Sequence, residues 1–303
     1  MGKIPSMSEV KSSIHVSVMP DEVLEYINPQ PGQVVVDGTL GGAGHAKMIA
    51  SRLVPGGCLI GLDRDAAPLQ RAEETLKGLP VILAQSNFCD LPETLEEIDG
   101  IDKVDAILLD LGLSSDQLAD RSRGFSFNSD GPLDLRFDVD HGEPAWKLIN
   151  RLSQQTLADL IYQYGEERFS RRIAQKIVET RRSNPIKTAA QLAELVRSCV
   201  PVERNRKNAI DPATRTFQAL RIAVNDELKS LEIALKRFPD VLKPGGILAI
   251  ISFHSLEDRR VKEAFRNDDR YEVLTPKALT ASPEEIEVNP RSRSAKLRVA
   301  RRN

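Results

Sequence analysis

Short apolar runs alternate with amphipathic stretches over the first third of the chain. Four of these runs predict buried strands, because parallel strands covered on both faces are almost continuously apolar; they are Val34–Asp37, Cys58–Asp63, Val81–Ala84 and Val104–Asp110. Apolar residues at helical spacing separate the strands, at Ala46–Leu53, Pro68–Lys77 and Leu91–Ile98. This alternation with short connections predicts an α/β fold with a doubly wound parallel sheet.

The alternation stops after Leu113. Residues 113–144 are rich in Ser, Asp, Gly and Phe and predict a long loop. Helical spacing without strands follows at Leu157–Tyr164, Ile173–Ile177 and Leu192–Cys199. One long helix is expected from Thr214 to Leu235, before strands at Ile247–Phe253 and Ala295–Ala300. We therefore predict a discontinuous sheet domain, residues 1–113 and 214–303, around a mainly helical inserted domain at 114–213.

The composition is that of a soluble globular protein, with 41% hydrophobic and 28% charged residues. No apolar run approaches the roughly 18 residues of a membrane span, and the N-terminus lacks a signal-peptide core. Three scattered cysteines indicate neither a disulfide framework nor a zinc site. We expect a cytoplasmic protein without a membrane partner.

Charge distribution is more informative than the net charge of −2. One basic group lies at the C-terminus and comprises Arg291, Arg293, Lys296, Arg298, Arg301 and Arg302. Another comprises Arg168, Arg171, Arg172, Lys176, Arg181 and Arg182. Each group is either a solvated face or a surface that contacts phosphates.

A glycine-dense turn follows the first strand, from Gly38 to His45. A strand, a glycine turn and a helix start together form a site for an anionic group. A dinucleotide fingerprint is incomplete because Lys47 stands at its third glycine, and no Gly-Lys-Ser/Thr occurs here. S-adenosylmethionine fits better, since Ala43, Gly44 and His45 can present N–H groups to its carboxylate. The alternative for His45 is a residue on the surface of the following helix.

Aspartates end three of the predicted strands. Asp37, Asp63 and Asp110 are expected to meet at the edge where the strand order reverses. We predict that Asp63 binds the ribose diol of the cofactor and that Phe88 walls its adenine. The alternative for Phe88 is a core aromatic, and that for Asp110 is a cap or turn residue.

Longer segments carry a resemblance that no general pattern provides. They are Asp110–Gln117, Gly124–Phe127, Asp130–Arg136, Tyr164–Arg168, Pro212–Ile222, Leu242–Gly246, Ile251–Arg259 and Asn289–Arg298. With Asp37–Thr39 and Gly44-His45, they resemble the bacterial 16S ribosomal RNA cytosine-N4 methyltransferase family, also called the MraW type. The resemblance implies a Rossmann-like class I methyltransferase that acts on a decoding-region cytosine of 16S rRNA in the small ribosomal subunit. The cofactor contacts that it implies are Ala43, Gly44, His45, Asp63, Phe88, Asp110 and Gln117.

A cytosine amine is a weak nucleophile, so placement and an acceptor for its N–H matter most. The Asp-Pro-Pro-Tyr motif of amino-methyltransferases is absent, and Asp110-Leu-Gly-Leu stands in its place. We hypothesise that Asp110, or a backbone carbonyl beside it, orients the amine. His254, Ser252 and Asp134 are expected as neighbours.

The target base must also leave its stack. Phe125 and Phe127 are candidates for holding it, unless they anchor the loop in a small core. Arg136, Arg215 and Arg221 are candidates for phosphate or base contacts, although Arg221 can instead be structural. Asp134, Asp138 and Asp140 lack the spacing of a calcium loop, so no metal site is predicted.

Two other functions stay open at this point. One is a methyltransferase for DNA or a small molecule, and the other is a non-catalytic RNA-binding protein that senses the cofactor. The inserted domain disfavours the first, and the three strand-end aspartates disfavour the second. The oligomeric state is also open, with a homodimer as one option.

Overall fold

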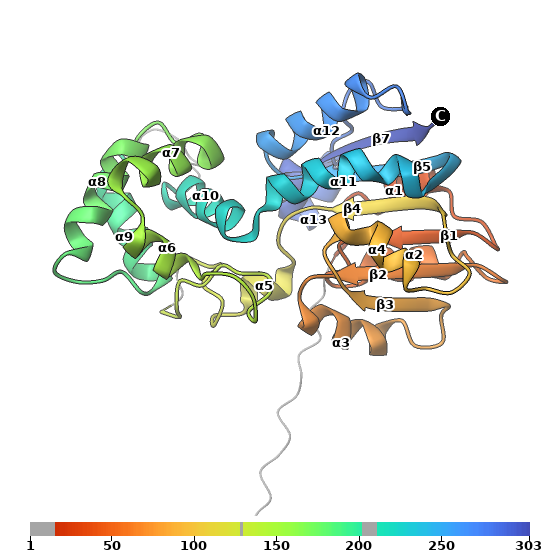
Figure 1. Ribbon diagram of the computed structural model, residues 1–303, viewed down its shortest axis with the longest axis horizontal. Coiled ribbons are helices and arrows are strands. Elements are labelled where there is room, and N and C mark those ends of the chain that lie inside the picture. The colour runs from red at the N-terminus through yellow and green to blue at the C-terminus, as the bar shows by residue number, and fades with distance from the viewer. Residues whose placement is uncertain (1–15, 128–129, 202–210) are drawn as a thin grey trace, which may run out of the picture.

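The computed structural model describes residues 16–127, 130–201 and 211–303. One seven-stranded sheet has the order β3-β2-β1-β4-β5-β7-β6 (Figure 1). Its strands are β1 (Val34–Asp37), β2 (Cys58–Asp63), β3 (Val81–Gln85), β4 (Val104–Asp110), β5 (Leu242–Ser252), β6 (Tyr271–Val273) and β7 (Lys296–Arg302). This confirms the Rossmann-like α/β class. The sheet is parallel from β1 to β5, whereas β7 runs antiparallel to β5 and β6 runs antiparallel to β7.

Successive residues of the central strands point into opposite helical layers. Val35 and Leu108 pack with α1 (Pro20–Ile27), α2 (Gly44–Ala50) and α3 (Ala66–Thr75). Val36 and Ile107 pack on the other face with α4 (Leu91–Glu96), α11 (Glu227–Val241) and α12 (Ser255–Asn267). Both faces of the sheet are therefore covered, which explains why its strands are apolar at nearly every position.

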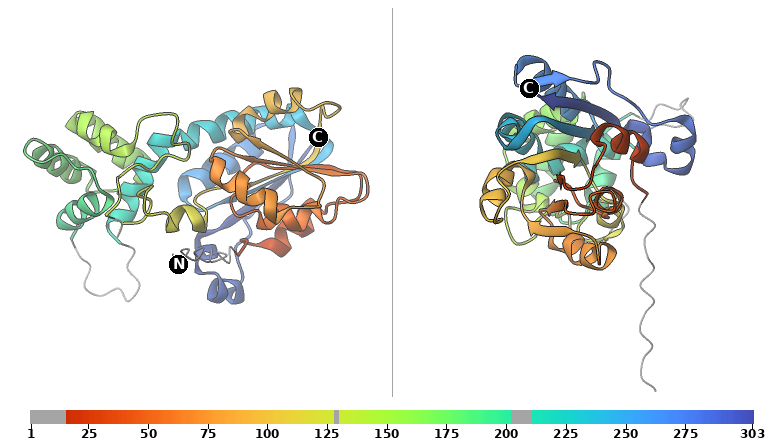
Figure 2. Two further views of the ribbon diagram at one scale, coloured as in Figure 1. Left: turned by 90° about the horizontal axis from the view of Figure 1, so that it is seen from below. Right: turned by 90° about the vertical axis from the view of Figure 1, so that its right-hand side faces the viewer.

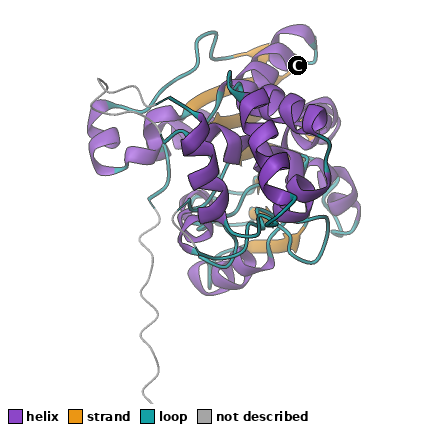
Figure 3. Cartoon of the chain, turned by 90° about the vertical axis from the view of Figure 1, so that its left-hand side faces the viewer, coloured by secondary structure: helices purple, strands orange, loops and turns teal. Residues whose placement is uncertain are grey.

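The helices of the insertion form a lobe at one end of the sheet (Figures 1 and 2). They are α6 (Ala145–Arg151), α7 (Gln154–Gly165), α8 (Ser170–Arg181), α9 (Ala189–Cys199) and α10 (Ala213–Asn225), whereas α5 (Ser115–Ala119) lies between this lobe and the sheet. Leu157, Ile161, Ile173 and Leu192 bury their side chains in a core of this lobe's own. Figure 3 views the molecule from this end, with the helical lobe in front of the strands.

The predicted long helix after Thr214 is wrong, because the structure has two helices there. Asp226 adopts a left-handed conformation with φ of 51° between α10 and α11, which aspartate tolerates better than most residues. Phe217 and Leu220 pack into the helical lobe, whereas Leu231 and Leu235 pack on the sheet. The predicted domain boundary at 213/214 thus falls at the start of a helix that shares the lobe's core. We propose that the inserted domain extends to Asn225.

The C-terminal part contains elements that the sequence pattern did not indicate. These are α12, the short strand β6, α13 (Pro283–Val288) and the 3-10 turn η2 (Pro290–Ser294). The basic residues of β7 are largely engaged within the chain: Arg298 and Lys296 pair with Asp258, at 2.7 and 3.2 Å, and Arg301 pairs with Glu272. In the described part of the chain, no helix has the length and apolarity needed to cross a bilayer.

Candidate active site

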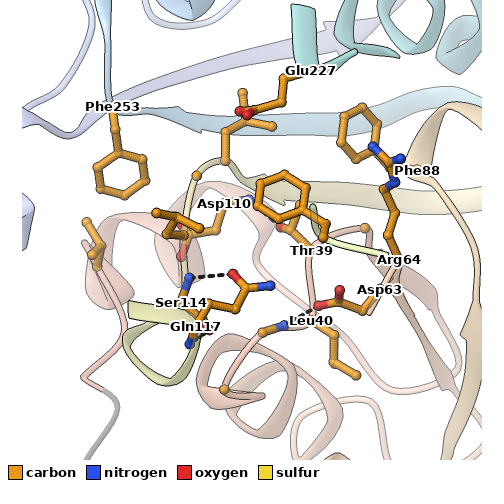
Figure 4. A pocket seen from close by; sticks show the side chains of 18 of the residues that line it. Thr39, Leu40, Asp63, Arg64, Phe88, Asp110, Ser114, Gln117, Glu227 and Phe253 are labelled. Carbon is orange, nitrogen blue, oxygen red and sulfur yellow. Dashed lines mark hydrogen bonds between the residues drawn. The ribbon is translucent and has the colours of Figure 1, made fainter. Parts of the chain in front are cut away.

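A cavity opens at the carboxyl ends of β1, β2 and β4. The strand order reverses between β1 and β4, which is where ligands bind in open α/β sheets. Its lining includes Gly38–Gly42, Asp63, Phe88, Asp110–Ser114 and Phe253. Figure 4 shows side chains from these separate segments converging on one space.

The glycine turn after β1 approaches its neighbours too closely for larger residues. A Cβ atom at Gly38 would lie 2.6 Å from Cδ2 of Leu109 and 3.1 Å from Cβ of Phe88. Ala43 follows in a left-handed conformation, is 1% exposed, and donates its N–H to the Leu40 carbonyl at 2.7 Å. This corrects the expectation that Ala43 offers its N–H to a ligand. Gly44 and His45 begin α2 and do line the cavity.

Asp63 is held by the backbone of two neighbouring loops. Its carboxylate accepts hydrogen bonds from Gly41 N at 3.0 Å and Asp65 N at 2.9 Å. Burial raises the pKa of Asp63 to about 6, against the lowering effect of these hydrogen bonds. Asp63 therefore orders the glycine turn and presents a carboxyl group to the cavity.

Phe88 and Gln117 both line the cavity, as predicted. Phe88 begins the 3-10 turn η1 (Phe88–Asp90) and also packs partly against the sheet core, so the core alternative holds in part. Gln117 forms a capping box with Ser114 at the start of α5 and donates to Asp65 at 3.4 Å. Asp65 in turn pairs with Arg123 at 3.1 Å, which ties the first loop of the insertion to the sheet.

Asp110 ends β4 at the centre of the cavity. Its N–H donates to Oγ1 of Thr39 at 2.6 Å, and Oδ2 lies 3.7 Å from Nδ1 of His45. Its other oxygen, Oδ1, is buried without a hydrogen-bond partner among the described residues. Burial raises the pKa of Asp110 to about 7, although the positive charge of Arg291 lowers it. Asp110 is thus a carboxyl group with an unsatisfied oxygen, as a ligand-binding or catalytic group requires.

His45 is buried, at 5% exposure, so the alternative of a surface helix residue is wrong. Its Nε2 atom lies 2.9 Å from the Val18 carbonyl oxygen, and burial lowers the pKa of the imidazole. Burial also raises the pKa of Asp37 to about 6, while the N–H of Thr39 bonds its carboxylate at 3.1 Å. The edge of the sheet therefore collects three carboxyl groups that a nearby cation would stabilise in their charged form.

A second polar group lies at the cavity wall formed by α11 and α12. Arg221 donates to both oxygens of Glu227 at 2.8 Å. These bonds support a structural role for Arg221 and not a contact with RNA. His254 caps α12: its Nδ1 accepts from Glu257 N, and its Nε2 lies 3.0 Å from Oε1 of Glu257, off the hydrogen-bond direction. Burial opposes ionisation of Glu257, but His254 and Arg221 outweigh it and lower its pKa.

Glu227, His254 and Glu257 bring three potential metal ligands together. Their existing bonds argue against a cation. Both oxygens of Glu227 are used by a guanidinium, and Nδ1 of His254 accepts an N–H, so Nε2 carries the ring proton. We interpret the group as an anchor for α11 and α12 at the cavity.

The two phenylalanines predicted to hold a base lie elsewhere. Phe125 is 4% exposed and stacks on Phe137 at 5.9 Å between ring centroids. Phe127 packs edge-on against Phe217 at 5.0 Å. Both belong to the core of the helical lobe and do not line the cavity. The alternative of loop anchors in a small core is therefore the correct one.

The other predicted substrate residues are dispersed. Arg136 is occupied by Asp134, with bonds of 2.8 Å to each of its oxygens. Arg215 is exposed on α10. Ser252 is fully buried, and its hydroxyl has no hydrogen-bond partner among the described residues. None of these four side chains lines the cavity.

Several cavity residues escaped prediction. Phe253 and Glu257 lie within the segment Ile251–Arg259, and Arg64 lies within the sequence around Asp63, but no spacing rule singles them out. Arg291 arrives from η2, where it donates to the Leu113 carbonyl. In the sequence, Arg291 is one of several clustered basic residues, and nothing distinguishes it as the one that lies near Asp110.

Comparisons with known proteins cover almost the whole chain. A family model described as the MraW methylase family matches residues 12–303. Ribosomal RNA small subunit methyltransferase H of Rhodopirellula baltica is 49% identical over 306 residues, spanning 97% of this chain and 93% of the relative. The protein of that name from Syntrophotalea carbinolica is 50% identical over 308 residues, spanning 95% and 98%. A solved structure of an rRNA methylase from Streptococcus thermophilus aligns over 93% of each chain, with a TM-score of 0.43 and 10% identity.

Proposed function

The chain belongs to the MraW methylase family, and from this premise we propose that it methylates the exocyclic N4 amine of a cytosine in the decoding region of 16S rRNA. At the coarser level, the chain is a methyltransferase for small-subunit ribosomal RNA. The finer assignment, to the N4 amine and the decoding region, rests on the segments in which the chain resembles the cytosine-N4 enzymes. Under this proposal, the partner of the protein is 16S rRNA in the small ribosomal subunit. The reaction takes place in the cytoplasm.

S-adenosylmethionine is the cofactor of this chain, as its methylase family implies. The cavity suits this cofactor, because the carboxyl groups of Asp63 and Asp110 line it, and burial makes each of them costly to ionise without a cation. Asp37 lies at the same sheet edge but does not line the cavity. We propose that Asp63 binds the ribose hydroxyls, Phe88 packs on the adenine, and Gly44, His45 and Gln117 complete the site. When bound, the cofactor supplies an electrophilic methyl group.

The observation that carries the catalytic proposal is the Oδ1 atom of Asp110, a buried oxygen without a hydrogen-bond partner among the described residues, on a residue that lines the cavity. A carboxylate there accepts a hydrogen bond from the amine of the acceptor base and turns the nitrogen lone pair toward the methyl group. The hydrogen bond that the backbone N–H of Asp110 donates to Oγ1 of Thr39 fixes the start of the segment Asp110–Ser114. His254 does not share this role, because its ring is committed to the cap of α12.

The helical lobe supports a large substrate. Its helix α8 exposes Arg171, Arg172 and Lys176, which suit contacts with RNA phosphates. A small-molecule substrate would not require this surface. A homodimer stays an open prediction.

The test is to incubate the protein with radiolabelled S-adenosylmethionine and small ribosomal subunits that lack the modification, and then map the labelled nucleotide. We expect label on the N4 atom of one cytosine, identified by nuclease digestion and mass spectrometry. Parallel reactions with naked 16S rRNA and with DNA separate the alternatives. Label on C5, on a ribose hydroxyl or only on DNA would contradict the assignment.

A further inference from the structure

Phe253 is an aromatic side chain at the end of the cavity away from Phe88. It follows Ser252 at the carboxyl end of β5, and β5 pairs with β4 so that Ile251 lies opposite Asp110. The N–H of Leu111 donates to the Ile251 carbonyl at 3.0 Å, which holds the two strand ends together. In the view of Figure 4, Asp110 lies between Phe253 on one side and Phe88 with Asp63 on the other.

The Phe253 ring packs partly against the sheet core and lies next to Gly112. Gly112 has a φ of 103°, and a Cβ atom built on it would lie 3.4 Å from Cδ2 of Phe253. A side chain at this position would therefore be strained by the backbone and would press on the ring. The glycine leaves the ring beside the segment that follows Asp110, with no side chain between them.

The position of Phe253 is fixed although its ring is only partly buried. Its N–H donates to Oε2 of Glu257 at 2.9 Å, and Glu257 is 3% exposed. The aromatic pairs of the described residues join Phe125 with Phe137, Phe127 with Phe217, and Phe265 with Tyr271. Phe253 takes part in none of them and lines the cavity, whereas Phe137, which also lines it, is already stacked on Phe125. A cavity-lining ring without an aromatic partner, on a backbone held by a hydrogen bond, is suited to receive a planar group.

We propose that Phe253, and not Phe125 or Phe127, is the side chain that stacks on the acceptor base and holds its amine beside Asp110. The inference rests on the proposed nucleic-acid methyltransferase function, but it concerns which residue binds the base. An extruded base needs a π-face to replace the stacking that it loses. Phe88 is committed to the cofactor end, and the two phenylalanines of the loop face the core of the helical lobe.

The polar residues beside Phe253 complete this slot. Glu227 and Glu257 line the same cavity, and Arg221 fixes the carboxylate of Glu227 through two hydrogen bonds. The acceptor base is thus offered the apolar face of Phe253 and, beside it, two carboxylates that are held in place by the bonds they already make, of which that of Glu227 keeps a second lone pair on each oxygen. This is the arrangement by which proteins hold a single unstacked base.

The test compares Phe253→Ala, Phe253→Leu, Phe253→Tyr and Phe253→Trp with the wild-type protein. We measure kcat and KM for small subunits, cofactor affinity by calorimetry, and the melting temperature. Loss of stacking should lower kcat/KM roughly 10- to 100-fold in the Ala variant. The Leu variant keeps the apolar bulk but lacks the π-face, so it should be impaired almost as strongly. Tyr and Trp should retain most of the activity, and cofactor affinity should change less than about twofold.

Phe265→Leu is the matched control, because Phe265 is a buried aromatic that packs on Tyr271 away from the cavity. It should lower the melting temperature without changing kcat/KM for subunits. Wild-type kcat/KM in Phe253→Leu, or a parallel loss of cofactor binding in Phe253→Ala, would overturn the inference.

The wild-type reaction separates this inference from the proposed function. If the wild-type protein methylates another nucleic acid and not small subunits, the proposed function fails, and the variants are compared on that substrate. If it methylates no nucleic acid, both the function and the role of Phe253 are refuted.

Discussion

The Nδ1 atom of His45 lies 3.7 Å from Oδ2 of Asp110, while Nε2 of the same ring lies 2.9 Å from the Val18 carbonyl oxygen. A carbonyl oxygen only accepts hydrogen bonds, so Nε2 carries the ring proton and Nδ1 faces Asp110 with its lone pair. Burial lowers the pKa of His45 and raises that of Asp110 to about 7. The pair is therefore a contact of a neutral imidazole with a carboxyl group that titrates near neutral pH, and not a salt bridge.

The first prediction concerns stability. The folded-state pKa of Asp110 lies above its ordinary value of 3.8, so the ionised form opposes folding. This cost is absent below about pH 4 and grows as the pH rises to about 7, up to roughly 4 kcal/mol at about 1.4 kcal/mol per pKa unit. Asp110→Asn should therefore raise the melting temperature of the ligand-free protein by several degrees at pH 8, and by less at pH 5. Differential scanning fluorimetry at both pH values measures this.

Asp102→Asn is the control for that experiment, since Asp102 is exposed before β4. It should leave the melting temperature unchanged at both pH values. An equal gain at pH 5 and pH 8 in Asp110→Asn would show that the effect does not come from ionisation of Asp110.

The second prediction concerns the reaction rate. If the Asp110 carboxylate accepts the hydrogen bond of the amine, kcat/KM for small subunits should rise with pH and level off above the pKa of Asp110. Burial raises this pKa to about 7 in the ligand-free protein, and the positive charge of the bound cofactor lowers it. Asp110→Asn should lose roughly 10²- to 10⁴-fold in rate and lose this pH dependence. Initial rates from pH 5.5 to 9 at constant ionic strength provide the profile. A wild-type rate that falls over this range would exclude the carboxylate as acceptor.

The third prediction concerns Arg291, whose charge lowers the pKa of Asp110. Arg291→Gln removes this charge, so the midpoint of the pH–rate profile should move to higher pH. Arg293→Gln is a close control, because Arg293 lies on the same turn η2 with its side chain exposed. The control should keep the wild-type midpoint, and a midpoint shared by all three proteins would contradict the role of Arg291.

The fourth prediction concerns RNA binding by α8. A triple change of Arg171, Arg172 and Lys176 to Gln removes three exposed charges. If each contacts a phosphate, the slope of log affinity against log salt should become less steep by roughly 2 to 3. Filter binding to small subunits from 50 to 300 mM salt measures the slope.

The matched control changes Arg52, Lys77 and Lys103, which are exposed near the amino-terminal ends of β2, β3 and β4. This edge of the sheet lies opposite the cavity, so the slope should stay at the wild-type value. Equal slopes for the two triple variants would show that α8 does not contact phosphates.

Much of the framework could be predicted from local pattern. The bounds of β1, β2 and β4 agree with the predicted runs, because a strand buried on both faces must be apolar throughout and ends where a polar residue reaches the sheet edge. The same rule predicts from the sequence alone that Asp37, Asp63 and Asp110 lie at one edge. The three aspartates lie near one another because the carboxyl ends of parallel strands all lie at the same edge of the sheet.

The tertiary structure decided what periodicity does not encode. Phe217, Leu220, Leu231 and Leu235 keep helical spacing across Asp226, yet they belong to two cores, because spacing reports a buried face and not the body against which it packs. In the same way, the glycine segment around Phe125 and Phe127 and the end of β5 at Phe253 each offer aromatic side chains. Only long-range packing buries the first two in the lobe and leaves Phe253 beside Gly112 in the cavity. Contacts between residues more than a hundred positions apart depend on the assembled sheet, and no local pattern specifies them.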